Sequence, residues 1–197
     1  GWWAVVSDDF VCDGRTLPRG ALVRYREWYG AGAQGGLRLG AEEVAAGILE
    51  REAGEAIFDS VADPSIFSQN GGPSVAERMS RMGVRFRRAD NTRVARAGAL
   101  SGWDQMRARI KGDGTTPMLY VFDRCRDFIR TVPALQHDPL RLEDLDTAGE
   151  DHIADETRYA CQSRPLIAVA PKPRGTPRDL PGWRYQRDEV MLGVRGL

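Results

Sequence analysis

Short apolar runs alternate with longer amphipathic segments along most of the chain, and this alternation is what most constrains the fold. Runs rich in β-branched and aromatic residues are typical of strands, and apolar residues spaced three and four apart are typical of helices. The expected strands lie at 2–7, 21–28, 56–61, 84–86 and 118–122. The expected helices lie at 41–52, 74–82, 92–111, 124–135 and 148–161. The pattern predicts an α/β fold in which helices flank a mixed sheet.

The order of these segments also predicts how the strands connect. A turn at Asp13-Gly14 favours a hairpin with a long loop between the first two strands. The sequence strand, helix, strand over 21–61 predicts a parallel pair joined by a crossover helix. We expect one domain over residues 1–162 and a proline-rich tail over 163–197. Because Gly1 already lies in a strand-like run, we expect a fragment that lacks its first strand.

Composition excludes two classes of protein. No apolar run approaches the roughly 20 residues that cross a bilayer, so no membrane partner is expected. The three cysteines, Cys12, Cys125 and Cys161, are an odd number without the spacing of a metal site. A disulfide framework is therefore not expected, and the sequence favours a cytoplasmic protein.

The charges segregate along the chain although 28 basic and 28 acidic residues cancel overall. Residues 78–111 hold ten basic side chains against two aspartates, and residues 123–159 hold ten acids against five arginines. Such asymmetry allows one face to bind a polyanion while another gathers carboxylates for a metal ion. A solvated helix face or a general preference for arginine gives the same pattern.

Asp63 is the first candidate for a functional residue because it closes an apolar strand directly before Pro64. In open α/β sheets, ligands bind beyond the carboxyl ends of the strands, and an acid there points to the functional edge. The alternative is that an aspartate before proline only ends the strand with turn chemistry.

The second candidate is an acidic segment that runs into the last expected helix. His152 and Asp155 lie three residues apart and so share a helix face, with Tyr159 four residues further on. An imidazole and a carboxylate on one face can both reach a divalent cation, or one can orient the other. Thr147 and Glu150 have the spacing of a capping box. The alternative is a surface helix with an ion pair such as Asp155 to Arg158.

Together the two candidates predict a metal site at one sheet edge. Mg²⁺ and Mn²⁺ prefer oxygen ligands, and two such ions about 4 Å apart can activate water and stabilise the leaving oxygen of a phosphodiester. Asp63 and Asp155 are the expected metal ligands, with Asp151 as a further candidate and His152 as their catalytic neighbour. Guanidinium groups bind phosphate regardless of base sequence. The arginines expected to contact DNA are Arg85, Arg87, Arg88, Arg93 and Arg96.

At these residues the chain resembles the C-terminal nuclease domain of the large terminase subunit of tailed bacteriophages, or of a prophage, over roughly residues 1–162. The matching motifs are Asp63-Pro64-Ser65, Ala89-Asp90-Asn91, Leu119-Tyr120-Val121-Phe122, Glu143-Asp144-Leu145-Asp146-Thr147, Glu150-Asp151-His152-Ile153-Ala154-Asp155 and Arg158-Tyr159. The resemblance implies an RNase H-like fold and an endonuclease that cuts concatemeric double-stranded DNA during packaging with two Mg²⁺ or Mn²⁺ ions. Asp63 matches the second metal-binding aspartate, Asp155 the third and His152 the neighbouring histidine. The implied partners are double-stranded DNA, the terminase ATPase domain, the small terminase subunit and the portal.

The chain departs from the family at the first acid, which lies in an Asp-X-Gly motif on the opening strand. We expect that residue to precede Gly1, because Asp8 and Asp9 are the only nearby substitutes and have the pattern of loop residues. The nucleotide-binding motif of a packaging ATPase is also missing. Activity could therefore be weak or lost, and two other functions stay open. One is a non-catalytic DNA-binding or assembly module with an incomplete metal site, and the other is a resolvase-like nuclease with an RNase H fold.

Overall fold

Three short strands form a mixed central sheet in the computed structural model, which describes residues 1–31, 36–94 and 101–166. The strands are β1 (Trp2–Val5), β4 (Leu22–Arg26) and β7 (Leu119–Val121). β4 lies in the middle, antiparallel to β1 and parallel to β7. Its residues Leu22, Val23 and Arg24 are all buried, which is the pattern of a strand covered on both faces.

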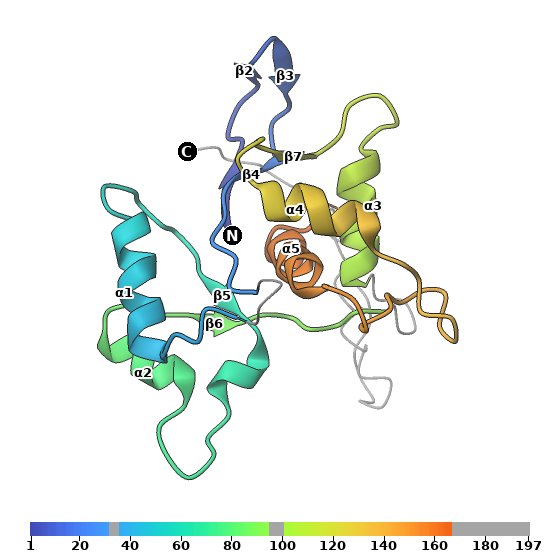
Figure 1. The fold of residues 1–197 in the computed structure, drawn as a ribbon. Coiled ribbons are helices and arrows are strands. Elements are labelled where there is room, and N and C mark those ends of the chain that lie inside the picture. Colours follow the sequence, from blue (N-terminus) through green and yellow to red (C-terminus); the bar gives the residue numbers. More distant parts are fainter. Residues whose placement is uncertain (32–35, 95–100, 167–197) are drawn as a thin grey trace, which may run out of the picture.

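Three helices cover this sheet, and one of them runs through the centre of the molecule (Figure 1). They are α3 (Gly102–Lys111), α4 (Arg126–Thr131, continued by a 3₁₀ turn, η2, Val132–Ala134) and α5 (His152–Ser163). The central helix is α5, which packs against both α3 and α4. Trp103 and Met106 of α3 meet Ala154 and Cys161 of α5 over Leu22. No helix within the described ranges is long and apolar enough to span a membrane.

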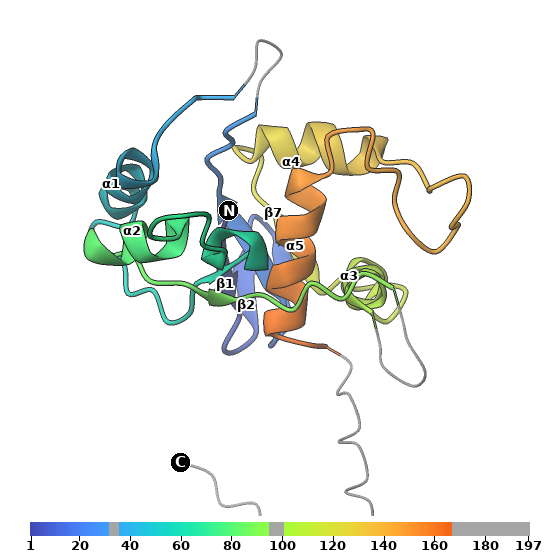
Figure 2. The same ribbon diagram turned by 90° about the horizontal axis from the view of Figure 1, so that it is seen from below.

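A second group of elements lies on the other side of α5 (Figure 2). Its helices are α1 (Ala41–Arg51), α2 (Val75–Arg81) and the 3₁₀ turn η1 (Pro64–Phe67), and its strands are β5 (Val61–Ala62) and β6 (Arg87–Arg88). The two strands pair in parallel, and β5 packs against α5. α1 and α2 pack through Ala41, Ala45, Met79 and Val84.

The predicted α/β class with a mixed sheet is confirmed, but one predicted pairing is wrong. Strand 56–61 shortens to β5, and it pairs with β6 rather than with β4. The physical reason is that both edges of β4 are already occupied, by β1 and β7, so a further strand cannot pair beside it. The strand expected at 84–86 forms directly after that range, as β6.

The predicted turn at Asp13-Gly14 is confirmed, and it closes a hairpin of its own. The hairpin consists of β2 (Phe10–Cys12) and β3 (Arg15–Leu17), and it projects from the sheet (Figure 1). Asp13 and Gly14 both have positive φ, 50° and 71°, which is the backbone that an Asp-Gly pair favours in tight hairpins. Asp8 and Asp9 lie at its base as exposed loop residues, as expected.

Helix boundaries differ from the prediction mainly at the N-terminal ends. Of the helix expected over 92–111, which the sequence allows to break near 98–102, residues 95–100 lie outside the described residues. The described part begins at Gly102, where Ser101 and Asp104 form a capping box. α5 begins at His152 rather than near residue 148, and Glu150 pairs with Arg130 at 2.7 Å, so the capping box expected from Thr147 and Glu150 is wrong. The predicted tail lies outside the described residues from 167 onward.

Candidate functional site

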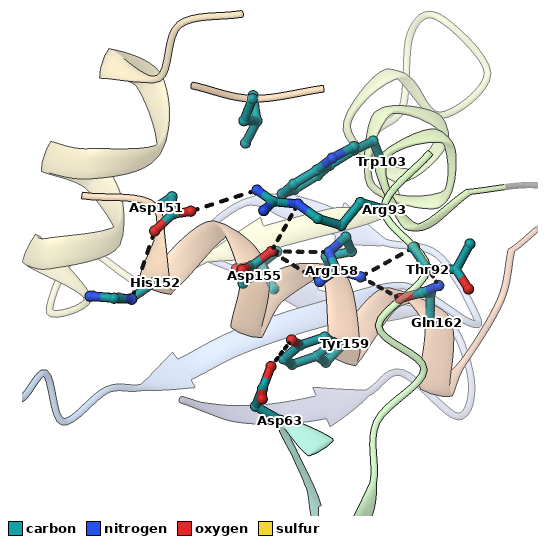
Figure 3. A network of polar contacts seen from close by, with 12 residues as sticks. Asp63, Thr92, Arg93, Trp103, Asp151, His152, Asp155, Arg158, Tyr159 and Gln162 are labelled. Carbon is teal, nitrogen blue, oxygen red and sulfur yellow. Dashed lines mark hydrogen bonds and ion pairs between the residues drawn. The ribbon is translucent and has the colours of Figure 1, made fainter. Parts of the chain in front are cut away.

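Asp63 ends β5 and holds two neighbouring elements together. Its Oδ1 accepts a hydrogen bond of 2.8 Å from the backbone N–H of Ser65 and so caps η1, which confirms the turn chemistry considered for this residue. Its Oδ2 accepts a hydrogen bond from the hydroxyl of Tyr159 on α5 (Figure 3). Partial burial opposes ionisation of the carboxyl, but the bonds from Ser65 and Tyr159 outweigh it and leave the pKa of Asp63 below its ordinary value.

Asp155 lies in the first turn of α5 and forms the ion pair considered for it. Its Oδ1 accepts hydrogen bonds from Nε and Nη2 of Arg158 at 3.2 and 3.0 Å. Arg158 is only 1% exposed, and it also donates to the carbonyl of Thr92 and the side chain of Gln162. A buried guanidinium needs such a complete set of partners. Arg158 therefore fixes Asp155 and joins α5 to the segment before α3.

Two more aspartates, Asp144 and Asp151, lie close to the guanidinium group of Arg93, and Figure 3 shows Asp151 and Asp155 beside it. Arg93 Nε is 3.3 Å from Asp144 Oδ1 and 3.9 Å from Asp155 Oδ1, and Nη2 is 3.6 Å from Asp151 Oδ2. Asp144 also accepts a hydrogen bond of 2.9 Å from the indole of Trp103. Burial raises the pKa of Asp144, but the indole, a backbone N–H and Arg93 together bring that pKa below its ordinary value.

His152 lies at the edge of this network rather than within it. Its side chain is 76% exposed, and Nδ1 is 3.7 Å from Asp151 Oδ1. The ring points away from Asp63 (Figure 3). The structure therefore places His152 beside Asp151 but does not bring it to Asp63, and a catalytic role for it stays a prediction.

Asp63 and Asp155 are both linked to α5, Asp155 as one of its residues and Asp63 through a hydrogen bond. Asp63 bonds to Tyr159, which follows Asp155 by one helical turn. Carboxylate oxygens suit Mg²⁺ and Mn²⁺ chemically. Within the described ranges, however, no group of three or more His, Cys, Asp or Glu side chains is close enough to hold a metal ion. Arginines balance these acids instead, and the predicted metal site stays a prediction.

The five arginines expected to bind DNA occupy different environments. Arg87 forms a two-point ion pair with Asp59, with bonds of 2.9 and 2.7 Å, and this pair lowers the pKa of Asp59. Arg88 is exposed at the β6 end beside Asp63, with its guanidinium carbon 4.9 Å from the ring centroid of Phe67. Arg85 is exposed, Arg93 turns inward to the acidic network, and Arg96 lies outside the described residues.

Sequence reasoning missed several residues that organise this region. Glu27 follows β4 directly, and its side chain is only 7% exposed. It accepts the backbone N–H groups of Asp127 and Phe128 at 2.7 and 3.2 Å and so caps α4. Its partners are about 100 positions away, so no local pattern could reveal them. Asp144 lies in the acidic segment before α5, which the sequence does single out. Nothing in that segment, however, predicts that Arg93 is its partner.

The chain matches no protein-family model, no curated protein and no solved structure. Its function is therefore inferred from its motifs and from the geometry of the acidic network.

Proposed function

We propose that this chain is a metal-dependent DNA endonuclease domain with an RNase H-like fold, of the kind found in phage terminase large subunits. The observation that carries the proposal is the hydrogen bond from Tyr159 to Asp63. It joins the acid at the carboxyl end of β5 to the helix that carries Asp155, although 92 residues separate the two acids in the sequence. A metal-dependent nuclease requires acids from two motifs near one cation at a sheet edge, and this contact supports such an arrangement.

In this proposal, Asp63 and Asp155 are the ligands of Mg²⁺ or Mn²⁺, and Asp151 with His152 would complete a second site. Bound ions would activate water and stabilise the leaving oxygen of the phosphodiester. The lowered pKa of Asp63 keeps its carboxylate ionised at neutral pH, ready to bind a cation. Tyr159 orients Asp63, and Arg158 orients Asp155. Such outer partners fix the direction in which a ligand oxygen points.

Double-stranded DNA would bind across the same edge. Arg88 is exposed beside Asp63, and Arg85 is exposed a few residues earlier, so both are available to phosphate. Contacts of this kind position the duplex without reading its bases. The terminase ATPase domain, the small subunit and the portal are the further partners that this assignment entails.

A plasmid-nicking assay tests the proposal. We expect the chain to nick supercoiled plasmid in the presence of Mn²⁺ and to stop when the metal is chelated. Asp63→Asn and Asp155→Asn each remove a ligand charge, and we expect each to reduce the nicking rate about a hundredfold or more. Asp113→Asn is the matched control, because Asp113 is an exposed turn residue that bonds only to its neighbours Thr115 and Thr116. Full nicking by the Asp155→Asn variant would contradict the proposal.

A second function is favoured by one specific observation. Asp144, Asp151 and Asp155 are balanced by Arg93 and Arg158, and the described residues contain no group of three or more His, Cys, Asp or Glu side chains that could hold a metal ion. This arrangement suits a DNA-binding or assembly module that does not cut. The same samples separate the two functions, because a gel shift of DNA without nicking supports the module.

A further inference from the structure

Arg93 occupies a central position in the acidic network. Its guanidinium group lies between Asp144, which precedes α5, and Asp151 and Asp155, at the start of α5. The guanidinium carbon is also 5.4 Å from the ring centroid of Trp103 (Figure 3). Arg93 itself follows β6, so a residue from a third segment places a positive charge among these three carboxylates.

The charge balance explains why a cation belongs there. Asp144, Asp151 and Asp155 are three negative charges in a half-buried setting, and within the described ranges only Arg93 pairs with all three. Arg158 contacts Asp155 alone among them. Carboxylates that share a site without a cation repel one another, and this repulsion destabilises the ionised state. Arg93 therefore supplies the positive charge that lets these acids stay together.

The contacts of Arg93 are also loose. The three N–O distances are 3.3, 3.6 and 3.9 Å, longer than the 2.7–2.9 Å that is typical of a charge-assisted hydrogen bond. Nε and Nη2 are buried, and among the described residues neither has a hydrogen-bond partner. The guanidinium is held by charge rather than by directional bonds, so moving it away breaks no hydrogen bond of these two atoms.

We propose that Arg93 is a built-in competitor for the divalent cation that the proposed function places at Asp155. A Mg²⁺ or Mn²⁺ ion bonds to carboxylate oxygens at close range, about 2.0–2.2 Å, and repels a guanidinium that faces the same oxygens. Cation binding and the inward position of Arg93 therefore oppose each other. The coupling is reciprocal: whatever draws Arg93 away, such as a DNA phosphate, strengthens cation binding.

Direct measurement of Mn²⁺ binding without DNA tests this inference. We compare the wild-type chain with Arg93→Gln by calorimetry, and we expect the variant to bind Mn²⁺ about tenfold more tightly, since the opposing charge is gone. Arg107→Gln is the matched control, because Arg107 is an exposed arginine of α3 that pairs with Asp104, and its Mn²⁺ affinity is expected to equal that of the wild type. If Arg93→Gln fails to fold alone, we expect Mn²⁺ to restore its circular dichroism spectrum.

The outcomes separate this inference from the function on which it rests. Mn²⁺ binding by the wild type with equal or weaker binding by Arg93→Gln overturns the competition and leaves the nuclease proposal standing. A misfolded Arg93→Gln that Mn²⁺ does not restore also overturns the competition. Absence of Mn²⁺ binding in every variant overturns both. Binding by Arg93→Gln alone supports the competition and favours the non-catalytic module for the wild type.

Discussion

At the scale of single residues, the side chain of Tyr159 holds the carboxylate of Asp63 against α5. Tyr159 donates to Asp63 from α5, and burial together with this bond raises the pKa of Tyr159 above its ordinary value. The hydroxyl therefore stays protonated and remains a donor throughout the pH range in which proteins are folded. Asp63 responds in the opposite direction, with a lowered pKa, because its charged form receives the bond.

Replacing Tyr159 by phenylalanine should weaken the fold in a pH-dependent way. We expect Tyr159→Phe to lower the free energy of unfolding by about 1 kcal/mol at neutral pH, a figure reduced for the partial exposure of Asp63. The folded pKa of Asp63 lies below its ordinary value of 3.8, so its ionised form stabilises the fold above that pH. This contribution is lost as the pH falls through the folded pKa, so the difference between variant and wild type should shrink there.

Urea denaturation between neutral pH and pH of about 3 measures this effect. Tyr120→Phe on β7 is the control, because it removes the hydroxyl of a tyrosine other than the one that bonds to Asp63. A difference between Tyr159→Phe and wild type that stays constant over the whole pH range would show that the bond to Asp63 is not its cause.

At the scale of elements, the site depends on how closely α3 approaches α5. Gly102 opens α3, and a Cβ atom at this residue would come within 3.0 Å of Cγ and Cδ of Arg158, closer than real Cβ atoms lie. The backbone N–H of Gly102 also donates to the carbonyl of Thr92, which Arg158 contacts as well. A residue without a side chain is thus what leaves room for the Arg158 side chain beside the start of α3.

Replacing Gly102 by alanine distinguishes side-chain packing from helix propensity, because the two predict opposite changes in the free energy of unfolding. Propensity alone predicts that alanine stabilises a helix by up to about 1 kcal/mol. The contact with Arg158 predicts a loss of about 1–3 kcal/mol, because a buried side chain must shift. We expect the loss, measured by urea denaturation. Gly149→Ala is the control, since a Cβ there meets no atom within 4 Å, and it should change the stability little.

At the scale of the whole molecule, charge is distributed so that only some arginines are available to DNA. Arg78 and Arg87 are paired with Glu42 and Asp59, and Arg93 faces inward. Arg88 stays exposed beside Asp63. The basic block of the sequence therefore presents less positive charge to a polyanion than its arginine count suggests.

The neighbouring residues Arg87 and Arg88 allow a matched test of this distribution. We expect Arg88→Gln to weaken DNA binding and to reduce the slope of log affinity against log salt by about 0.9, the loss of one phosphate contact. Arg87→Gln should reduce the slope less, because Asp59 already neutralises its charge. Fluorescence anisotropy with a DNA duplex at several salt concentrations measures both. If both variants show the same slope of log affinity against log salt, the ion pair with Asp59 does not reduce the contribution of Arg87 to DNA binding.

Local patterns predicted part of this molecule well. The α/β class, the helices α1 and α2 and the turn at Asp13-Gly14 follow from residues that are close in sequence, such as Ser74 and Glu77 in the capping box of α2. The same patterns failed where distant partners decide the outcome. β5 pairs with β6 because β4 has no free edge, and α5 starts late because Glu150 pairs with Arg130 instead of capping it.

The sequence by itself determined the candidate residues: Asp63 before a proline, and His152 and Asp155 on one helix face with Tyr159. Only the tertiary structure decided their surroundings. It brought Tyr159 to Asp63 and placed Arg93 among three carboxylates from two segments. The physical reason is that propensities and caps act over a few residues, whereas charge balance and burial act between side chains that meet only after the chain has folded.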